Sequence, residues 1–414
     1  MKRSEYLNTE KGKALEKFKR FRKNIWIEID QEPGTKKSLS QEEKARFRKE
    51  VSNFLKSNKR KAFRNDIILK IEFFTSQDNV PPLRTLTKNY LDLLHKPMPD
   101  VDKLNRILFN DDDQIKLLIT NYNFDYFGNK KPRIRIRAQR FSLFKEDLEL
   151  AQFVHRNYDV QEEFNRSNNL SNFDNDYDQY LDLLNDEKWM VKNDMLDSFN
   201  LTKQFLRQRV QESYLKSNSI NFENLFNIFQ SSFKKNKILL ENESLQRIWE
   251  TMEKISPLAF NAIPLGGAPI ASGQKKIFKQ TIEEKLDEFK SKHKILFPLV
   301  HPIGIILFYT PPIRNSLDLD NLAKMIMPKL IESFNPPPSI HSSLEYLEKF
   351  PELYKLSKSK QKLPKTAITN YQVVNRTRRQ NSPEAGEIDL FITDGMQSFY
   401  NLWSQIDSLT DFVD

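Results

Sequence analysis

Apolar and polar positions along the chain follow one order of elements twice. Residues 25–76 begin with an alternating apolar segment, pass through a Pro/Gly turn into a helical pattern of about four turns, and end with the β-branched and aromatic run 67–74. Residues 260–310 repeat this order and end with the run 303–309. Because the order is shared over so many positions, it indicates a tandem duplication.

Each copy continues with two more segments that have the composition of strands. They cover residues 113–124 and 132–140 in the first copy, and 367–377 and 387–393 in the second. The intervening residues 146–255 contain no proline or glycine and carry helical periodicity. We therefore predict an α/β (α+β) fold with two related domains joined by a helical insert.

The chain divides into five predicted segments. These are a basic N-terminal helix (1–24), a first α/β domain (25–145), the helical insert (146–255), a second α/β domain (256–395) and an acidic C-terminal helix (396–414). In the C-terminal helix, a single face gathers the apolar residues Phe399, Leu402, Trp403, Ile406 and Leu409. We predict that this helix docks on the body of the protein; an acidic lid over a DNA groove is the alternative.

Composition limits the partners and the chemistry. The formal net charge is +10 and the pI about 9.3, a balance that favours polyanionic partners, above all nucleic acid. The absence of cysteine excludes disulfides, thiolate zinc sites and cysteine nucleophiles. No apolar run approaches the roughly 20 residues that cross a bilayer, so we expect a cytoplasmic protein without a membrane partner.

Two acidic motifs stand out in this basic chain. Both follow the pattern D-x-D-x-L-x-[R/K] after a Pro-containing loop. They comprise Asp100, Asp102 and Arg106 in the first copy, and Asp318, Asp320 and Lys324 in the second. A further acidic run, Asp111 to Asp113, follows the first motif. The tandem motif, more than either copy alone, suggests a shared chemical role.

The spacing of these acids favours a metal site. Two carboxylates at alternate positions of an extended segment share one side and repel each other unless a cation lies between them. Oxygen ligands select Mg²⁺ or Mn²⁺, which can activate water and stabilise charge on a phosphodiester. The predicted ligands are Asp100, Asp102, Asp112 and Asp113 in the first copy and Asp318 and Asp320 in the second. The alternative is that Asp102 or Asp320 only caps a following helix.

The second motif, D-L-D-N-L-A-K, resembles that of the RusA-like Holliday junction resolvases, and Asp112-Asp113-Gln114-Ile115 resembles the later D-D-x-Q-I segment of the same family. The resemblance implies small α/β domains that pair, here as an intrachain pseudo-dimer. It also implies Mg²⁺-dependent cleavage of four-way DNA junctions in recombination and repair. In that family the aspartates bind metal and the lysine acts at the phosphate.

Each copy carries a different half of the family pattern. Lys365 and Thr366 align with Asp112 and Asp113, so the second copy lacks these acids. We therefore expect the first copy to be the active one, with Asp100, Asp102, Arg106, Asp112 and Asp113 as its catalytic set and Lys324 as the lysine of the second motif. The second copy is then degenerate and kept for DNA binding or packing.

Two groups of arginines are candidate DNA contacts. Neighbouring arginines on one sheet face suit contact with phosphates, although pairing with acids is the alternative. The candidates are Arg133, Arg135 and Arg137 in the first copy and Arg376, Arg378 and Arg379 in the second.

The resulting hypothesis is a Mg²⁺- or Mn²⁺-dependent endonuclease or resolvase acting on branched or structured DNA. A mobile-element or anti-phage defence setting would suit this architecture, and the helical insert is a candidate surface for a protein partner. Two alternatives stay open at this point: a non-catalytic DNA-binding scaffold built from degenerate domains, and an RNA-directed nuclease.

Overall fold

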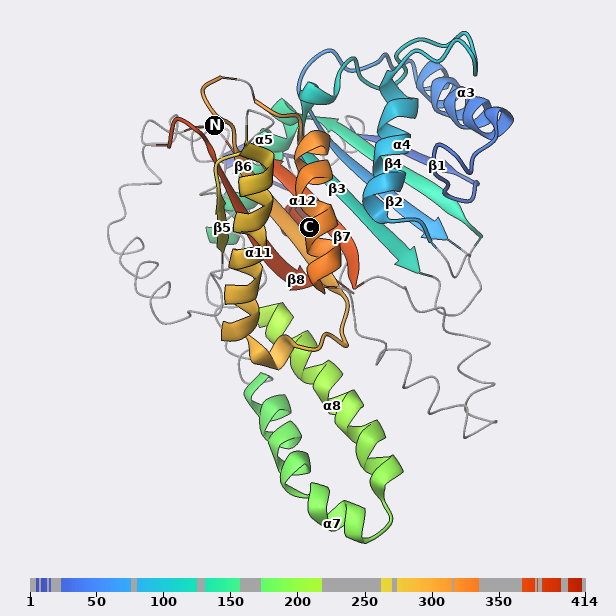
Figure 1. Ribbon diagram of the computed structural model, residues 1–414. Helices are drawn as coiled ribbons and strands as arrows, with labels where there is room; N and C mark the ends of the chain where they lie inside the picture. The colour runs from blue at the N-terminus through green and yellow to red at the C-terminus, as the bar shows by residue number, and fades with distance from the viewer. Residues whose placement is uncertain are drawn as a thin grey trace.

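Eight strands form one mixed sheet at the centre of the protein, in the order β1-β4-β2-β3-β7-β6-β8-β5 (Figure 1). The computed structural model describes residues 5–6, 9–12, 15, 24–75, 80–124, 131–156, 173–217, 262–269, 274–314, 316–334, 367–376, 378, 382–395 and 401–411. The predicted mixed α/β class is confirmed. The predicted N-terminal helix (1–24) lies largely outside the described residues.

The two halves of the chain supply matching elements. In the first half these are β1 (Ile25–Ile29), α3 (Gln41–Ser57), β2 (Ile67–Thr75), α4 (Leu83–His95), β3 (Ile115–Phe124) and β4 (Arg133–Arg140). In the second half they are β5 (Ile263–Gly266), α11 (Gln274–Lys292), β6 (Ile303–Thr310), α12 (Leu319–Phe334), β7 (Ile368–Asn375) and β8 (Glu387–Asp394).

Strand pairing is the same in both halves. β2 and β3 are parallel, as are β6 and β7, while β4 and β8 lie antiparallel to their neighbours. Both parallel pairs have an irregularity after the first residue, at Ile67/Ile68 and at Ile303/Gly304. β3 and β7 then join the halves as an antiparallel pair.

The β3–β7 pair relates the halves by an approximate two-fold axis. Ile119 pairs with Lys70, the fourth residue of β2, and Gln372 pairs with Ile306, the fourth residue of β6. Ile119 and Gln372 therefore hold equivalent places, and they face each other across the β3–β7 pair. An axis through this residue pair exchanges the two sets of four strands.

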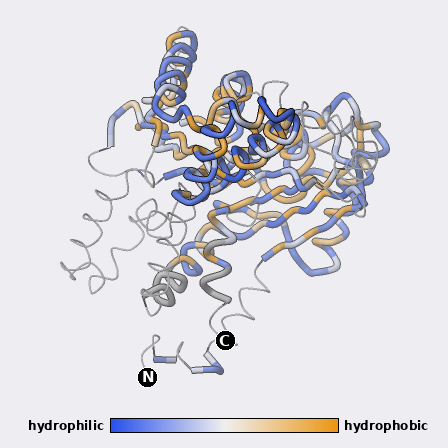
Figure 2. Tube along the Cα trace, turned by 90° about the horizontal axis from the view of Figure 1, so that it is seen from below, coloured by the Kyte–Doolittle hydropathy of each residue, from blue (hydrophilic) through white to orange (hydrophobic). Residues whose placement is uncertain are grey.

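Helices cover both faces of the sheet. The side chains of one face pack with α3, α4, α11 and α12 in the larger hydrophobic core. Alternate residues of the same strands, such as Ile68 and Ile119, point to the other face and pack with α5 (Phe141–Arg156) and α15 (Leu402–Asp411). In Figure 2 hydrophobic and hydrophilic residues alternate along the trace, as expected of strands and helices that bury one side.

The C-terminal helix docks on the sheet, as predicted. Leu402, Trp403 and Ile406 of α15 are buried against α5 and the strands. Phe399 and the side chain of Leu409 lie outside the described residues. This helix therefore acts as a structural cover for the second face of the sheet.

The described residues of the insert form a helical hairpin that projects away from the sheet (Figure 1). It contains a helix over 173–185, α7 (Glu187–Lys192) and α8 (Leu196–Ser217). The insert boundary predicted at 146 is wrong, because α5 begins at Phe141 and belongs to the sheet cover. Residues 218–261 lie outside the described residues of the chain.

Candidate active site

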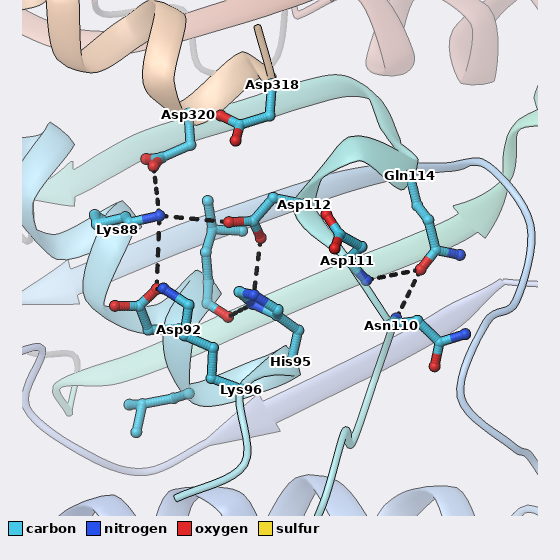
Figure 3. Close-up of polar contacts among 12 residues, drawn as sticks. Lys88, Asp92, His95, Lys96, Asn110, Asp111, Asp112, Gln114, Asp318 and Asp320 are labelled. Carbon is cyan, nitrogen blue, oxygen red and sulfur yellow. Dashed lines mark hydrogen bonds and ion pairs between the residues drawn. The ribbon is translucent and has the colours of Figure 1, made fainter.

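Acidic residues from the two halves meet at one edge of the β3–β7 pair. Because the two strands are antiparallel, the start of β3 lies beside the end of β7, and β6 ends at the same edge. The segment after β6 leads into α12, so Asp318 and Asp320 come to the turn that carries Asp112 (Figure 3). The C-terminal half of α4 completes the arrangement. We call the group Lys88, Asp92, His95, Asp112, Asp113, Asp318 and Asp320 the acidic site.

Lys88 lies among the carboxylates from three elements. Its Nζ is 2.6 Å from Asp320 Oδ2, 3.4 Å from Asp112 Oδ2 and 3.5 Å from Asp92 Oδ1. Asp320 and Asp112 are both buried, with exposures of 3% and 7%. Several carboxylates buried close together repel one another and need a compensating cation. Lys88 supplies one positive charge.

His95 and Asp112 form a second contact within the site. His95 Nδ1 lies 2.9 Å from the carbonyl oxygen of Leu91 and 3.2 Å from Asp112 Oδ1. A carbonyl can only accept, so Nδ1 carries the hydrogen and places its positive end close to Asp112. The imidazole ring stacks on Phe109, with ring centroids 5.3 Å apart, which fixes its orientation.

A short turn holds Asp112 in place. Asp111 caps the 3₁₀ helix η1 (Asp112–Gln114) by accepting a hydrogen bond from the backbone of Asp113. The Gln114 side chain accepts from the backbone N–H groups of Asn110 and Asp111 and donates to the carbonyl oxygens of Phe63 and Asn65. The glutamine of the D-D-x-Q-I segment is thus a clamp that presents the aspartate.

Asp318 and Asp320 have different surroundings. Asp318 caps α12, because its carboxylate accepts hydrogen bonds from the backbone and side-chain N–H groups of Asn321 at 2.6 and 2.7 Å. Asp320, two residues on, is buried inside the first turn of α12 and faces Lys88. The residue that caps α12 is therefore Asp318, and not Asp320 as the capping alternative had it. The one-sided D-x-D geometry expected of an extended segment does not apply within a helix.

Burial and neighbouring charges shift the pKa values of the acidic site. Burial raises the pKa of Asp112, and the charges of Asp320 and Asp318 raise it further, against His95 and Lys88, which lower it. Burial likewise raises the pKa of Asp320 in spite of Lys88. Burial lowers the pKa of Lys88, but its contacts with Asp320, Asp112 and Asp92 outweigh burial and raise it. Lys88 therefore stays charged at neutral pH.

The residues present fit a hard divalent cation. Asp112 Oδ1 is buried and accepts no hydrogen bond among the described residues. Asp92, His95 and Asp112 also offer one ligand atom each within 4.8 Å of one another. Carboxylate oxygens dominate the donor set, which is typical of Mg²⁺ or Mn²⁺ rather than of a softer metal. Asp112, Asp113, Asp318 and Asp320 were among the predicted metal ligands.

The other half of the prediction, a metal site at Asp100 and Asp102, is not supported by the geometry. The helix expected after Asp102 is absent, since residues 96–111 are irregular. Asp102 Oδ2 lies 2.8 Å from Nε of Arg48, whose side chain is fully buried. Asp100 and Arg106 are exposed. Within the described residues no hydrogen bond, ion pair or candidate metal group joins Asp100 or Asp102 to Asp112.

Arg48 explains why Asp102 lies where it does. The guanidinium donates to four carbonyl oxygens at the C-terminal end of α4 and in the loop that follows it, those of Leu93, Lys96, Leu104 and Asn105. Asp102 also accepts a hydrogen bond from the backbone of Leu104 at 2.9 Å. The aspartate neutralises a buried arginine and fixes a loop, and this is a structural role.

The structural repeat of the second motif lies earlier in the first half. Ile67 corresponds to Ile303 in the sheet, an offset of 303 − 67 = 236 residues. The same offset matches Leu83 with Leu319, the first residues of α4 and α12 (319 − 83 = 236). The two helices share six buried positions at this offset, from Leu83/Leu319 to Leu94/Leu330. The predicted match of Asp102 with Asp320 is therefore wrong.

This offset reveals residues that the sequence analysis missed. Lys88 corresponds to Lys324 (324 − 88 = 236), so the lysine of the second motif has a counterpart in α4. Pro82 and Arg84 occupy the places of Asp318 and Asp320. An alignment without gaps at offset 236 would have found Lys88 from the sequence. Asp92 and His95 are i+4 and i+7 from Lys88, the spacing of one helix face.

The candidate arginines of the first half are engaged within the protein. Arg133 and Arg135 form ion pairs with Glu28, at 3.2 and 2.8 Å. Arg137 is bound by Asp407 and lies over the ring of Trp403. All three lie on the α15 face, opposite the face covered by α4 and α12.

The second group of arginines is engaged as well. Arg376 lies 3.2 Å from Glu387 and 2.7 Å from Asp389. Arg378 donates to the carbonyl oxygens of Pro311 and Ser382. Arg379 lies outside the described residues. The alternative of arginines paired with acids or held by backbone groups thus describes these residues.

No protein-family model, curated protein or solved structure matches the chain. Among the described residues, the helices are all too short or too polar to cross a membrane.

Proposed function

We propose that the protein is a metal-dependent endonuclease for branched or structured DNA, built from two RusA-like copies that form an intrachain pseudo-dimer. The observation that carries the proposal is the convergence of Asp112 with Asp318 and Asp320 around Lys88. Each copy has half of the family motif, and the two halves lie together. The active site is therefore composite, instead of belonging to the first copy alone.

Asp112 and Asp320 would hold Mg²⁺ or Mn²⁺, with Asp113, Asp318 and Asp92 nearby. The ion, when bound, supplies activation of water and stabilisation of charge on the phosphodiester. Lys88 keeps its proton at neutral pH, so it cannot act as a base. Its ammonium group would instead stabilise the negative charge that develops on the phosphate as the P–O bond breaks.

The test compares two acids of the same acidic stretch. Asp112→Asn is expected to abolish Mg²⁺-dependent cleavage of a synthetic four-way DNA junction and to weaken Mn²⁺ binding measured by calorimetry. Asp100→Asn, at an exposed position, is the matched control and should behave as wild type. Absence of Mg²⁺- and Mn²⁺-dependent cleavage of branched, duplex and single-stranded DNA by the wild type would refute the proposal.

The second candidate is a non-catalytic DNA-binding scaffold, favoured by the ion pairs of Lys88, which supply a cation to the carboxylates of the acidic site without a metal. A measurement of metal affinity distinguishes this scaffold from a nuclease. A scaffold would bind a branched DNA equally well with and without Asp112, and would show no Mn²⁺ binding that depends on this residue. An RNA-directed nuclease is tested by offering a branched RNA beside the DNA junction.

A protein partner of the insert stays a proposal. The helical hairpin exposes large apolar side chains, with Trp189 60% and Phe205 59% accessible. Exposed apolar groups of this size on a projecting element are typical of protein contacts.

A further inference from the structure

The place related to the acidic site by the two-fold axis has the opposite charge. At the offset of 236 residues, four residues of this place are identified. Pro82 corresponds to Asp318, Arg84 to Asp320, Lys324 to Lys88 and Pro328 to Asp92. Ile331 replaces His95. We call these five residues the basic position.

None of these five residues can act as a carboxylate ligand. Asp112 and Asp113 correspond to Lys365 and Thr366, because β3 and β7 are offset by 368 − 115 = 253 residues. Those two residues lie outside the described residues of the chain, but their side chains also contain no carboxylate. Every acid of the acidic site is thus replaced by a neutral or basic residue.

The cations of the basic position are accessible. Lys324 is exposed and Arg84 is partly exposed, and no ion pair engages either of them among the described residues. Lys88, their counterpart in the acidic site, is instead held by three carboxylates. Unpaired cations at this place can contact a phosphate, and the described residues there include no counterpart of the carboxylates that would hold a metal in the acidic site.

We infer that one binding event on a two-fold-symmetric branched DNA gives one incision, with the basic position holding the equivalent phosphate of the second strand uncut. A symmetric DNA placed on the axis through Ile119 and Gln372 offers equivalent phosphates to both places. Among the described residues, only the acidic site has the carboxylates that would hold the metal for cleavage. The inference rests on the proposed function and specifies its product as a nick.

The test uses a supercoiled plasmid that extrudes a cruciform. Protein is bound to the plasmid in EDTA, and excess Mg²⁺ is added together with an excess of unlabelled four-way junction, so that each complex reacts once. Nicked circles without linear DNA are the expected product. Linear DNA formed within the single event would overturn the inference alone. Binding without any cleavage would refute the proposed function and the inference together.

A second measurement tests the basic position independently of cleavage. The double variant Arg84→Ala/Lys324→Ala should bind the junction several-fold more weakly, with a smaller salt dependence, while Mn²⁺ binding at the acidic site is kept. Lys103→Ala, which removes an exposed lysine elsewhere, is the matched control. Unchanged junction affinity of the double variant would overturn the role of the basic position.

Discussion

The acidic site and the basic position occupy equivalent places in one sheet and differ in almost every charged residue. Lys88 and Lys324 are the shared element, yet the first is enclosed by Asp92, Asp112 and Asp320 and the second is exposed. The strands and helices beside them follow the same order and pairing. The difference shows that the shared fold supplies the place, whereas a few side chains decide whether that place can hold a metal.

The largest effect is expected from removing a carboxylate of the acidic site. Asp320→Asn should lower the rate of junction cleavage by about 100-fold or more, the scale of a lost contact to developing charge. The paired change at the basic position, Arg84→Asn, should lower junction affinity and leave metal binding intact. Single-turnover rates and Mn²⁺ titrations of both variants check the comparison. Equal loss of metal binding in the two would contradict it.

Substitution of Lys88, the lysine that the acidic site shares with the basic position, should affect both cleavage and stability. Lys88→Met is expected to slow cleavage by about 10- to 100-fold, because a charge that stabilises the transition state is lost. It also leaves the buried carboxylates without their cation, so the metal-free protein should be less stable and should gain more from Mg²⁺. Cleavage rates and thermal unfolding with EDTA or Mg²⁺ measure both effects. A Lys88→Met variant with wild-type rates would show that the lysine is only structural.

Breaking the Arg48–Asp102 pair should affect stability before activity. Arg48→Met removes a fully buried charge and leaves four backbone carbonyl groups without this donor, so we expect a loss of about 3 kcal/mol in the free energy of unfolding. Chemical denaturation measures it. The variant should still bind Mn²⁺ where it is folded, in contrast to Asp320→Asn.

Metal-free stability should depend on pH through the acidic site. The folded-state pKa values of Asp112 and Asp320 are raised, so the native state binds protons more tightly than the unfolded chain. Stability in EDTA should therefore fall as the pH rises from the unfolded value near 3.8 through the higher folded values. Mg²⁺ at 100 times its dissociation constant should restore about 2.7 kcal/mol at neutral pH. Thermal melts across pH 4 to 7 test the direction, and Asp112→Asn should flatten the profile.

The smallest effect is expected from the arginines of β4. Arg135→Gln removes a guanidinium that already binds Glu28 and lies on the face away from the acidic site. Junction affinity should change by less than about twofold, since an engaged cation releases few counterions. A change larger than that of Arg84→Ala would show that the DNA lies on the other face of the sheet.

Local patterns predicted the strands, the helices α3 and α11 and most of the acids, whereas α4 (Leu83–His95) lies where only a Pro-containing loop was expected. β2 and β6 are apolar runs long enough to be recognised, and Asp112, Asp318 and Asp320 were selected from their motifs. These features depend on residues close together in the sequence, where periodicity and composition are informative.

What could not be predicted depends on contacts between distant residues. Asp112 and Asp320 are 320 − 112 = 208 residues apart, and only the pairing of β3 with β7 brings them together. The match of Asp102 with Asp320 failed because D-x-D is short and recurs by chance, while Pro82 and Arg84 conceal the true counterpart. No local pattern could tell that Asp102 neutralises a buried arginine, since Arg48 lies 54 residues away.

The β3–β7 pair joins two halves that belong to one chain, and this has a consequence for inheritance. In a dimer of identical subunits one gene encodes both sites, so any substitution appears in both at once. Here the two places are encoded separately, and one could exchange its acids for Arg84 and Pro82 while the other kept Asp320 and Asp318. Covalent joining thus allows selection to act on each half of a symmetric architecture by itself.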